Sequence, residues 1–331
     1  MNRRKFNKSS ALLAVGLSTG LSIGCDDKKK IPDAAANSSA MEDKPQPFFK
    51  LSLAQWSLHK EIQAGTMDPF SFARKAKELG FTGLEYVSDL YNDWMEAQEG
   101  DPMRKLGDRL LEESQKNDME NLLIMIDGMG DLGIQDEKKR LEGVENHKPW
   151  IDMAQRIGCH AIRLNLFGDG TYDQQLAAST DSMKRLGDYG ATKGIHVLVE
   201  NHGGYSSDPE WVVKVMKGAG STHIGTLPDF GNFCIEREGG ARWSAKCINE
   251  YPDYYKAVEM MMPYAKAVSA KSYAFDKDGY ETKIDYPKML QVIKDAGYKG
   301  YIGVEYEGEA SGAEGSLATK ELLLKAAAQL K

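Results

Sequence analysis

The chain has 331 residues, 41% of them hydrophobic and 27% charged, which is ordinary for a globular protein and excludes a collagen-like or wholly disordered chain. Its 49 acidic residues outnumber its 42 Lys and Arg, and the net charge of -7 argues against nucleic acid as a partner, because phosphate binding needs a basic face. Four cysteines exclude a disulfide scaffold, and the length fits either two average domains or one α/β barrel of roughly 250 residues with additions.

The first 24 residues join a basic start to an apolar continuation. No acid accompanies the basic residues here, so removing their +4 from -7 leaves -11 for the rest of the chain. Residues 9–24 are uncharged, and at 1.5 Å per residue they make a helix of about 24 Å, shorter than the roughly 30 Å hydrocarbon core. This layout predicts a secretory signal over residues 1–24, and its start resembles the twin-arginine export motif. The four basic residues are Arg3, Arg4, Lys5 and Lys8.

A possible lipid attachment point follows the signal. Cys25 comes after Leu-Ser-Ile-Gly, which resembles a lipobox, where this cysteine would carry lipid and become the first mature residue. An ordinary signal cleaved nearby is the alternative. Residues 25–47 are polar, aperiodic and rich in Ala, Ser and Pro, which predicts a flexible tether. We therefore expect an exported, periplasmic protein that contacts the membrane only through a lipid anchor at Cys25.

The remaining cysteines are Cys159, Cys234 and Cys247. With Cys25 acylated, this odd number cannot all form pairs. Cys159 and Cys234 lie in strand-like segments, where a buried small apolar side chain is the simplest interpretation. We expect all three as core residues.

From residue 48 onward, short apolar segments alternate with longer amphipathic ones. The predicted strands are 50–58, 83–88, 121–127, 161–167, 196–201, 224–229, 267–273 and 301–306. The predicted helices are 69–79, 103–116, 143–157, 176–193, 210–217, 254–265, 286–295 and 316–330. Several helices end at Gly, where a left-handed cap is easiest, and several begin after Asp-Pro. These units predict an α/β fold, a single (β/α)8 TIM barrel over residues 48–331, preceded by the signal sequence and flexible linker. A doubly wound open sheet is the competing fold, but no Gly-x-Gly-x-x-Gly follows the first strand.

Three predicted strands end in a carboxylate, namely Glu200, Asp229 and Glu305. Barrel enzymes place their chemistry at the carboxyl ends of the strands. A charge there is costly to desolvate unless a partner compensates it, and a divalent cation does so for carboxylates. Any one of these acids could instead be a helix cap or a solvated loop residue. Their occurrence on three strands favours a shared metal site.

The segments VENHGGYSSDP, GTLPDFGNF, VSAKSY and YIGVEYEG resemble the sugar phosphate isomerase/epimerase superfamily, the xylose-isomerase-like barrels, and the resemblance extends over about 48–331. It implies a divalent metal (Mn, Mg, Co or Zn) held by acids after strands five, six and eight and by a His on strand seven. Glu200, Asp229 and Glu305 match the acids, while Ser269 stands at the His position. His202 could be the fourth ligand, since it lies two residues beyond Glu200 and so on the same strand face. Ser269 or water is the alternative.

Other polar side chains near the predicted strand ends are interpreted as a substrate cleft rich in hydroxyl-binding groups, with cations for a carboxylate, phosphate or oxyanion. A structural hydrogen bond inside the barrel is the alternative for each. Lys271 shares the strand face of Ser269, and Asn232 stands where the family often has His. The predicted substrate-binding residues are Gln55, His59, Glu85, Arg163, Asn165, His202 and Asn232.

The resemblance and the carboxylates together predict a metal-dependent sugar isomerase or epimerase. The cation would polarise the carbonyl of a keto-sugar and stabilise the enediolate, and Glu200 and Glu305 would transfer the proton from opposite sides. Lys271 is the third predicted catalytic residue. Loss of a β-leaving group from the same intermediate would make the protein a lyase or hydratase on a keto-sugar or keto-glycoside.

A sugar-binding lipoprotein without catalysis is the hypothesis from another class. Ser269 in place of His favours it, whereas retention of all three carboxylates favours an enzyme. Both hypotheses predict a small carbohydrate as partner. The DNA-repair branch of the superfamily is rejected, because the predicted domain is acidic and exported. The sequence does not predict an oligomeric state.

Overall fold

The computed structural model describes residues 46–330, which belong to one compact unit. The predicted signal and nearly all of the predicted tether lie outside these residues. Within them, no helix combines the length and the apolar character needed to cross a membrane.

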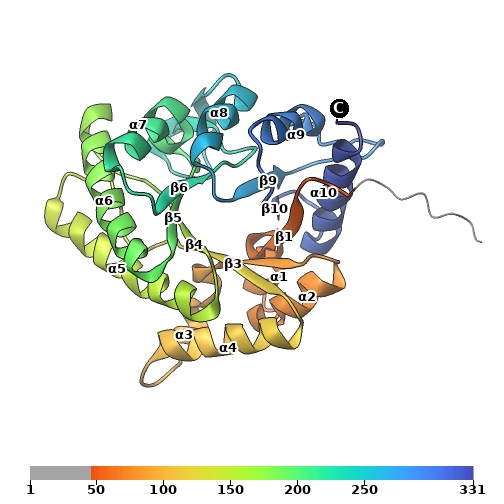
Figure 1. Ribbon diagram of the computed structural model, residues 1–331, viewed down its shortest axis with the longest axis horizontal. Helices are drawn as coiled ribbons and strands as arrows, with labels where there is room; N and C mark the ends of the chain where they lie inside the picture. The colour runs from red at the N-terminus through yellow and green to blue at the C-terminus, as the bar shows by residue number, and fades with distance from the viewer. Residues whose placement is uncertain (1–45, 331) are drawn as a thin grey trace, which may run out of the picture. The chain divides into compact units, whose positions relative to one another are not determined.

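Eight parallel strands form the centre of the fold, as predicted (Figure 1). Their order in the sheet is β6-β5-β4-β3-β2-β1-β10-β9, so every strand lies beside its neighbour in the barrel sequence, and β10 returns to β1. Seven of the eight predicted segments contain the observed strand, and the third begins one residue earlier than predicted. The strands are β1 (Lys50–Ala54), β2 (Gly83–Val87), β3 (Glu120–Met125), β4 (Ala161–Leu164), β5 (His196–Glu200), β6 (Ile224–Leu227), β9 (Val268–Ser272) and β10 (Tyr301–Tyr306).

The barrel closes between β6 and β9 through isolated bridges rather than a regular ladder. Thr226 pairs with Ala265, and Asp229 pairs with Ser269, both in parallel orientation. The Ser269 N–H donates to the Pro228 carbonyl at 2.9 Å. This seam therefore fixes the backbone of Asp229 and Ser269 side by side.

Helices surround the strands, as Figure 1 shows. The predicted caps are confirmed: α5 and α6 end at Gly158 and Gly194, with φ of 81° and 70°. At the start of α7, the Asp208 carboxylate accepts from the backbone N–H groups of Glu210 and Trp211. The helices are α1 (His59–Gln63), α2 (Phe72–Glu78), α3 (Asn92–Glu96), α4 (Pro102–Lys116), α5 (Glu137–Ile157), α6 (Tyr172–Lys193), α7 (Pro209–Ala219), α8 (Tyr254–Met261), α9 (Tyr286–Asp295) and α10 (Gly312–Ala327).

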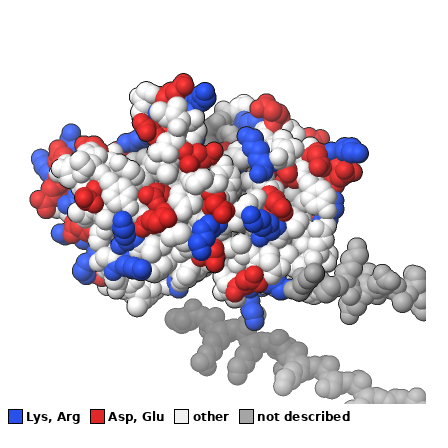
Figure 2. Space-filling model, turned by 90° about the horizontal axis from the view of Figure 1, so that it is seen from above, with Lys and Arg blue, Asp and Glu red and all other residues white. Residues whose placement is uncertain are grey.

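Two hydrophobic clusters divide the core. The larger one includes Ile162, Val197 and other residues buried beneath the helices, while a smaller one includes Leu123 and Leu198 of β3 and β5. Because side chains alternate across a strand, Leu198 and Glu200 share a face. The smaller cluster therefore shares the barrel interior with polar side chains. On the outer face drawn in Figure 2, acidic and basic side chains are interspersed rather than gathered by sign.

The predicted first strand is longer than the observed one. β1 ends at Ala54, and residues Gln55–Leu58 form a 3-10 turn. The Gln55 side chain accepts from the Val87 N–H at 3.1 Å and donates to the Tyr91 hydroxyl at 2.7 Å. These two bonds tie the turn to the end of β2 and to the segment that follows it.

A two-stranded antiparallel hairpin, β7 (Cys234–Arg237) and β8 (Cys247–Glu250), follows β6 and was not predicted. A disulfide joins Cys234, the first residue of β7, to Cys247, the first residue of β8. Cys234 is buried, as predicted, whereas the prediction of Cys247 as a core residue is wrong because it is only partly buried. The disulfide itself was not predicted, and it forms because the hairpin brings two cysteines 13 residues apart to a Cα–Cα distance of 5.8 Å. The prediction for Cys159 is confirmed, since it is free and buried.

Candidate functional site

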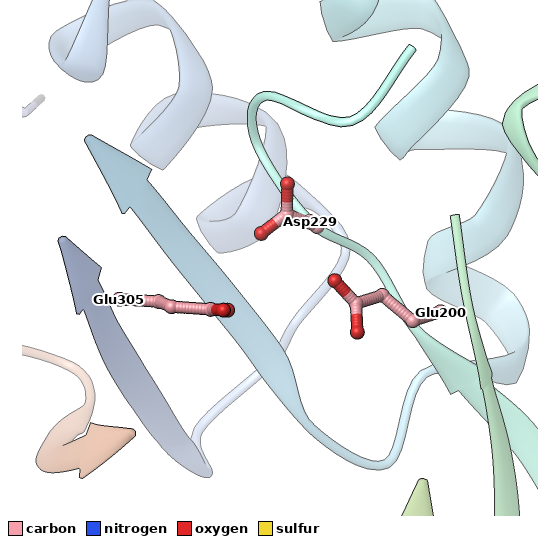
Figure 3. Close-up of side chains that lie close together, drawn as sticks. All are labelled: Glu200, Asp229 and Glu305. Atoms are coloured by element: carbon pink, nitrogen blue, oxygen red, sulfur yellow. The ribbon is translucent and has the colours of Figure 1, made fainter. Parts of the chain in front are cut away.

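Three buried carboxylates converge at the carboxyl ends of the strands. Glu200 is the last residue of β5, Asp229 lies two residues beyond β6, and Glu305 lies in β10. One carboxylate oxygen from each lies within 4.8 Å of the others. Figure 3 shows Glu200 and Glu305 pointing toward each other from opposite sides, with Asp229 beside them. The structure thus brings together the three acids that the sequence singled out as metal ligands.

The Ser269 hydroxyl lies between two of these acids. Its Oγ is 2.6 Å from Asp229 Oδ2 and 3.0 Å from Glu305 Oε2. A hydroxyl has one proton and can donate to only one acceptor at a time. The other close oxygen–oxygen contact therefore needs a further proton or a cation to be favourable.

Arg163 of β4 supplies one buried positive charge. Its Nε is 2.7 Å from Glu200 Oε2, and its NH1 donates to Asp127 Oδ1 at 3.0 Å. The Nε–H is poorly aligned for a hydrogen bond to Glu200, so that contact is an ion pair by distance. Arg163 is 3% exposed, and its charge therefore acts on both carboxylates with little screening.

Lys271 of β9 supplies the second buried positive charge. Its Nζ is 2.9 Å from Glu305 Oε1 and 2.9 Å from Glu307 Oε1, and the residue is fully buried. Burial raises the pKa of Glu307, but the Lys271 charge and hydrogen bond outweigh it and lower that pKa overall. Lys271 therefore holds the two glutamates on either side of it in place.

The positive charge in the cluster is smaller than the negative charge. Arg163 and Lys271 face Glu200, Asp229, Glu305 and, at the edges, Asp127 and Glu307, which is two cations against five carboxylates. Burial, reinforced by Glu305, raises the pKa of Glu200 to about 7 against the opposing effect of Arg163. Burial also raises the pKa of Asp229. Hard oxygen donors and a deficit of positive charge both fit a divalent cation such as Mg or Mn.

The predicted residues Asn165, His202 and Asn232 lie next to the cluster. The Asn165 amide donates to Asp127 Oδ1 at 2.5 Å, and its oxygen lies 2.9 Å from His202 Nδ1. The Asn232 amide donates to Glu200 Oε1 at 3.0 Å. His202 is not a member of the group of ligand atoms formed by the three acids, so its ring is placed beside Asn165 rather than among them.

Gln55 and Glu85 lie apart from the cavity described below. The hydrogen bonds of Gln55 are internal, to Val87, Tyr91 and the Pro69 carbonyl. Glu85 lies inside the barrel, where its Oε1 accepts from the Ser52 hydroxyl at 2.6 Å and burial raises its pKa to about 8. Both residues therefore make structural hydrogen bonds inside the protein, which was the alternative to a role in substrate binding.

A cavity of about 960 Å³ opens above the cluster. Of the three acids, Glu305 reaches its wall, whereas Glu200 and Asp229 lie behind it, as does Lys271. His59 lines the cavity at the β1 side, with its ring stacked on Trp56 at a centroid distance of 4.2 Å. The polar residues of the wall include Asp127, Arg163, Asn165, His202, Asn232 and Glu307.

Asp127 and Glu307 are site residues that the sequence reasoning missed. Asp127 ends the predicted third strand and contacts both Arg163 and Asn165. Glu307 follows β10 directly and contacts Lys271. The rule that selected the three buried acids, a carboxylate at the end of an apolar run, could have found both.

The sequence matches the family described as xylose isomerase-like TIM barrel over residues 73–327. An inosose dehydratase from Geobacillus thermodenitrificans (strain NG80-2) is 26% identical over 138 residues. That match spans 38% of this chain and less than half, 45%, of the relative.

Solved structures share the fold at low sequence identity. The 3-keto-D-glucoside 4-epimerase YcjR from E. coli superposes with a TM-score of 0.59 at 15% identity, over 83% of this chain and 98% of that one. A xylose isomerase-like TIM barrel protein from Mycobacterium smegmatis, solved in complex with magnesium, gives a TM-score of 0.58 at 15% identity, over 85% and 97%. At these identities the likeness shows the fold alone.

Proposed function

Because this chain belongs to the family of xylose isomerase-like TIM barrels, we propose that it is an enzyme that isomerises or epimerises a sugar by moving a proton next to a carbonyl group. One observation carries this proposal. Glu200, Asp229 and Glu305, from three strands, meet within 4.8 Å beneath a polar cavity. Burying three carboxylates together is costly unless the site uses them.

We further propose that these three acids hold a divalent metal ion. The position of the Ser269 hydroxyl between two carboxylate oxygens supports this. Its single proton can be donated to one of them, and a cation would offset the repulsion between the hydroxyl oxygen and the other. When bound, the ion would supply electrophilic polarisation of the substrate carbonyl. Ser269 Oγ or a water molecule would complete the ligand set, since His202 offers no ring nitrogen within the 4.8 Å group formed by the three acids.

Proton transfer is assigned to the two glutamates of the cluster, of which Glu305 lines the cavity and Glu200 lies behind its wall. Glu305 faces the substrate space and can accept the proton from the carbon beside the carbonyl. The Lys271 Nζ lies 2.9 Å from Glu305 Oε1 and holds that carboxylate in position. Glu200 approaches from the opposite side of the cluster and is the candidate for returning the proton on the other face, which produces an epimer.

A second candidate reaction is elimination of water from the same intermediate. The curated relative named inosose dehydratase favours it, although the match spans less than half of that protein. The two reactions share the first proton abstraction and differ in whether a β-hydroxyl leaves.

Solvent exchange tests the proposed chemistry. Purified protein supplied with Mn²⁺ or Mg²⁺ is incubated in D₂O with a panel of ketoses, keto-glycosides and inososes, and NMR follows the carbons beside the carbonyl. We expect deuterium at that carbon of at least one substrate, together with an epimer or the isomeric aldose. Deuterium exchange accompanied by loss of the β-hydroxyl would show that the protein is a dehydratase and not an isomerase. Binding without exchange or product across the panel would identify a sugar-binding protein and refute the enzyme.

We also propose that the protein is exported and lipid-anchored. Disulfides persist mainly in oxidising compartments, so the Cys234–Cys247 bond supports an extracytoplasmic location.

Changing both Arg3 and Arg4 to Lys is expected to retain the full-length precursor in the cytoplasm. Cys25→Ser is expected to move the protein from the membrane to the soluble fraction. Fractionation and immunoblotting measure both, and unchanged distribution of the two variants would overturn the proposal.

A further inference from the structure

We infer that the cavity takes a two-ring sugar, a glycoside, with its second ring stacked on Trp243. This inference rests on the proposed function and specifies its substrate class. The volume of about 960 Å³ is close to the upper limit of small-molecule pockets, which run from about 300 to 1,000 Å³. A single pyranose ring placed against Glu305 would leave much of this space to water.

Aromatic pairs stand at two separate places on the wall. Trp56 and His59, stacked 6° from parallel, follow β1, which lies next to β10 and Glu305. Phe167 follows β4 and meets Trp243 at 5.1 Å between ring centroids. β2 and β3 separate β1 from β4 in the sheet, so the two pairs lie on different sides of the barrel mouth. The reacting ring is assigned to the Glu305 side and the second ring to the Trp243 side.

Trp243 is unusual for a large apolar residue, because it is 46% exposed while lining the cavity. Its ring also lies 4.7 Å from that of His202. Burial against the core does not explain this position, since so much of the indole remains open. A flat indole at a cavity wall offers a large amphipathic surface of the kind that stacks on the apolar face of a sugar.

The loop carrying Trp243 is held in place by several contacts. The disulfide links the start of β7 to the start of β8, and Arg242 NH1 donates to Asp131 Oδ1 at 2.9 Å. The Arg242 guanidinium also lies over the Phe167 ring, 4.7 Å from its centroid. Fixing the loop before binding reduces the entropy that the ligand must offset. Charged groups from the hairpin, Arg237, Arg242 and Glu250, line the same part of the cavity and can bind hydroxyls.

Paired ligands test this inference. Calorimetry on the intact protein compares methyl glucosides with maltose, cellobiose, lactose and trehalose. We expect at least one disaccharide to bind about tenfold more tightly than the methyl glucoside, in line with one added aromatic contact. Trp243→Ala should reduce this advantage to about twofold without changing the monosaccharide Kd, and Trp243→Phe should retain most of it. Ile248→Ala, on the same hairpin and 53% exposed but away from the cavity, is the matched control and should change neither value.

The outcomes separate this inference from the proposed function. If monosaccharides bind and exchange deuterium but no disaccharide binds more tightly, the two-ring substrate is refuted and the enzyme stands. If the disaccharide still binds more tightly than the methyl glucoside after Trp243→Ala, the stacking site is refuted. The stacking site is also refuted if Trp243→Ala changes only the sedimentation of the protein, because Trp243 would then contact another protein molecule. Absence of both sugar binding and exchange would refute the inference and the proposed function together.

Discussion

Glu305→Gln is expected to lower the rate of deuterium exchange about a thousandfold, within the range of 10²–10⁴ that a positioned general base contributes. Of the three clustered acids, Glu305 is the one that reaches the cavity wall. The substitution keeps the shape of the side chain but removes the base, and it weakens the ion pair with Lys271. Exchange rate, bound metal by mass spectrometry and thermal unfolding are measured on the same preparation.

Two further Glu→Gln variants make the expectation specific. Glu307→Gln changes the other carboxylate paired with Lys271 and should cost far less, about tenfold, because Glu307 lies outside the cluster of three acids. Glu78→Gln lies in an exposed ion pair with Arg74 and should leave the rate unchanged. A larger loss in Glu307→Gln than in Glu305→Gln would transfer the role of base to Glu307.

The strand order and the three acids could be predicted because they depend on local pattern. Apolar runs of strand length alternate with amphipathic helices, and this period is read directly from the sequence. Once eight parallel strands are assumed, their carboxyl ends meet on one face. Glu200, Asp229 and Glu305 therefore had to lie near one another if the barrel was right.

The partners of these acids could not be predicted in the same way. Whether Arg163 contacts Glu200 or Asp127 depends on the register of β4 against its neighbours, which no local pattern specifies. Ser269 was noticed as the residue in place of His, but its position between two carboxylates follows from the irregular seam between β6 and β9.

The hairpin was missed for a different reason. Residues 234–250 contain Gly-Gly and few apolar residues, and they pack above the barrel instead of in it, so they lack a strand period. The odd number of cysteines excluded complete pairing but was compatible with one pair and one free thiol. Only the folded hairpin shows that Cys234 and Cys247 are the pair, with Cys159 left free.

Arg163→Met is expected to lower the free energy of unfolding by about 3–5 kcal/mol, the usual cost of leaving a buried charge without its partner. Arg163 is 3% exposed and Glu200 is fully buried, so solvent cannot replace the lost guanidinium. The matched surface variant is Arg74→Met, which breaks an exposed pair with Glu78 and should cost about 0.5 kcal/mol or less. Urea unfolding in EDTA measures both, so that no metal ion compensates Glu200.

A second substitution identifies the cause of that loss. Adding Glu200→Gln to Arg163→Met removes the uncompensated charge and should recover at least half of the lost stability, whereas additive losses would show that packing around Arg163 is responsible.

The pH dependence of the stability of Arg163→Met is a second test of the same cause. With Arg163 present the pKa of Glu200 is about 7, and removing the guanidinium raises it further. In both proteins stability falls as pH rises above about 4.5, because the unfolded chain releases this proton while folded Glu200 keeps it. In wild type this fall ends near pH 7, whereas in the variant it continues to higher pH. The difference from wild type should therefore be smaller at pH 5 than at pH 8, and a difference independent of pH would contradict the role of Glu200.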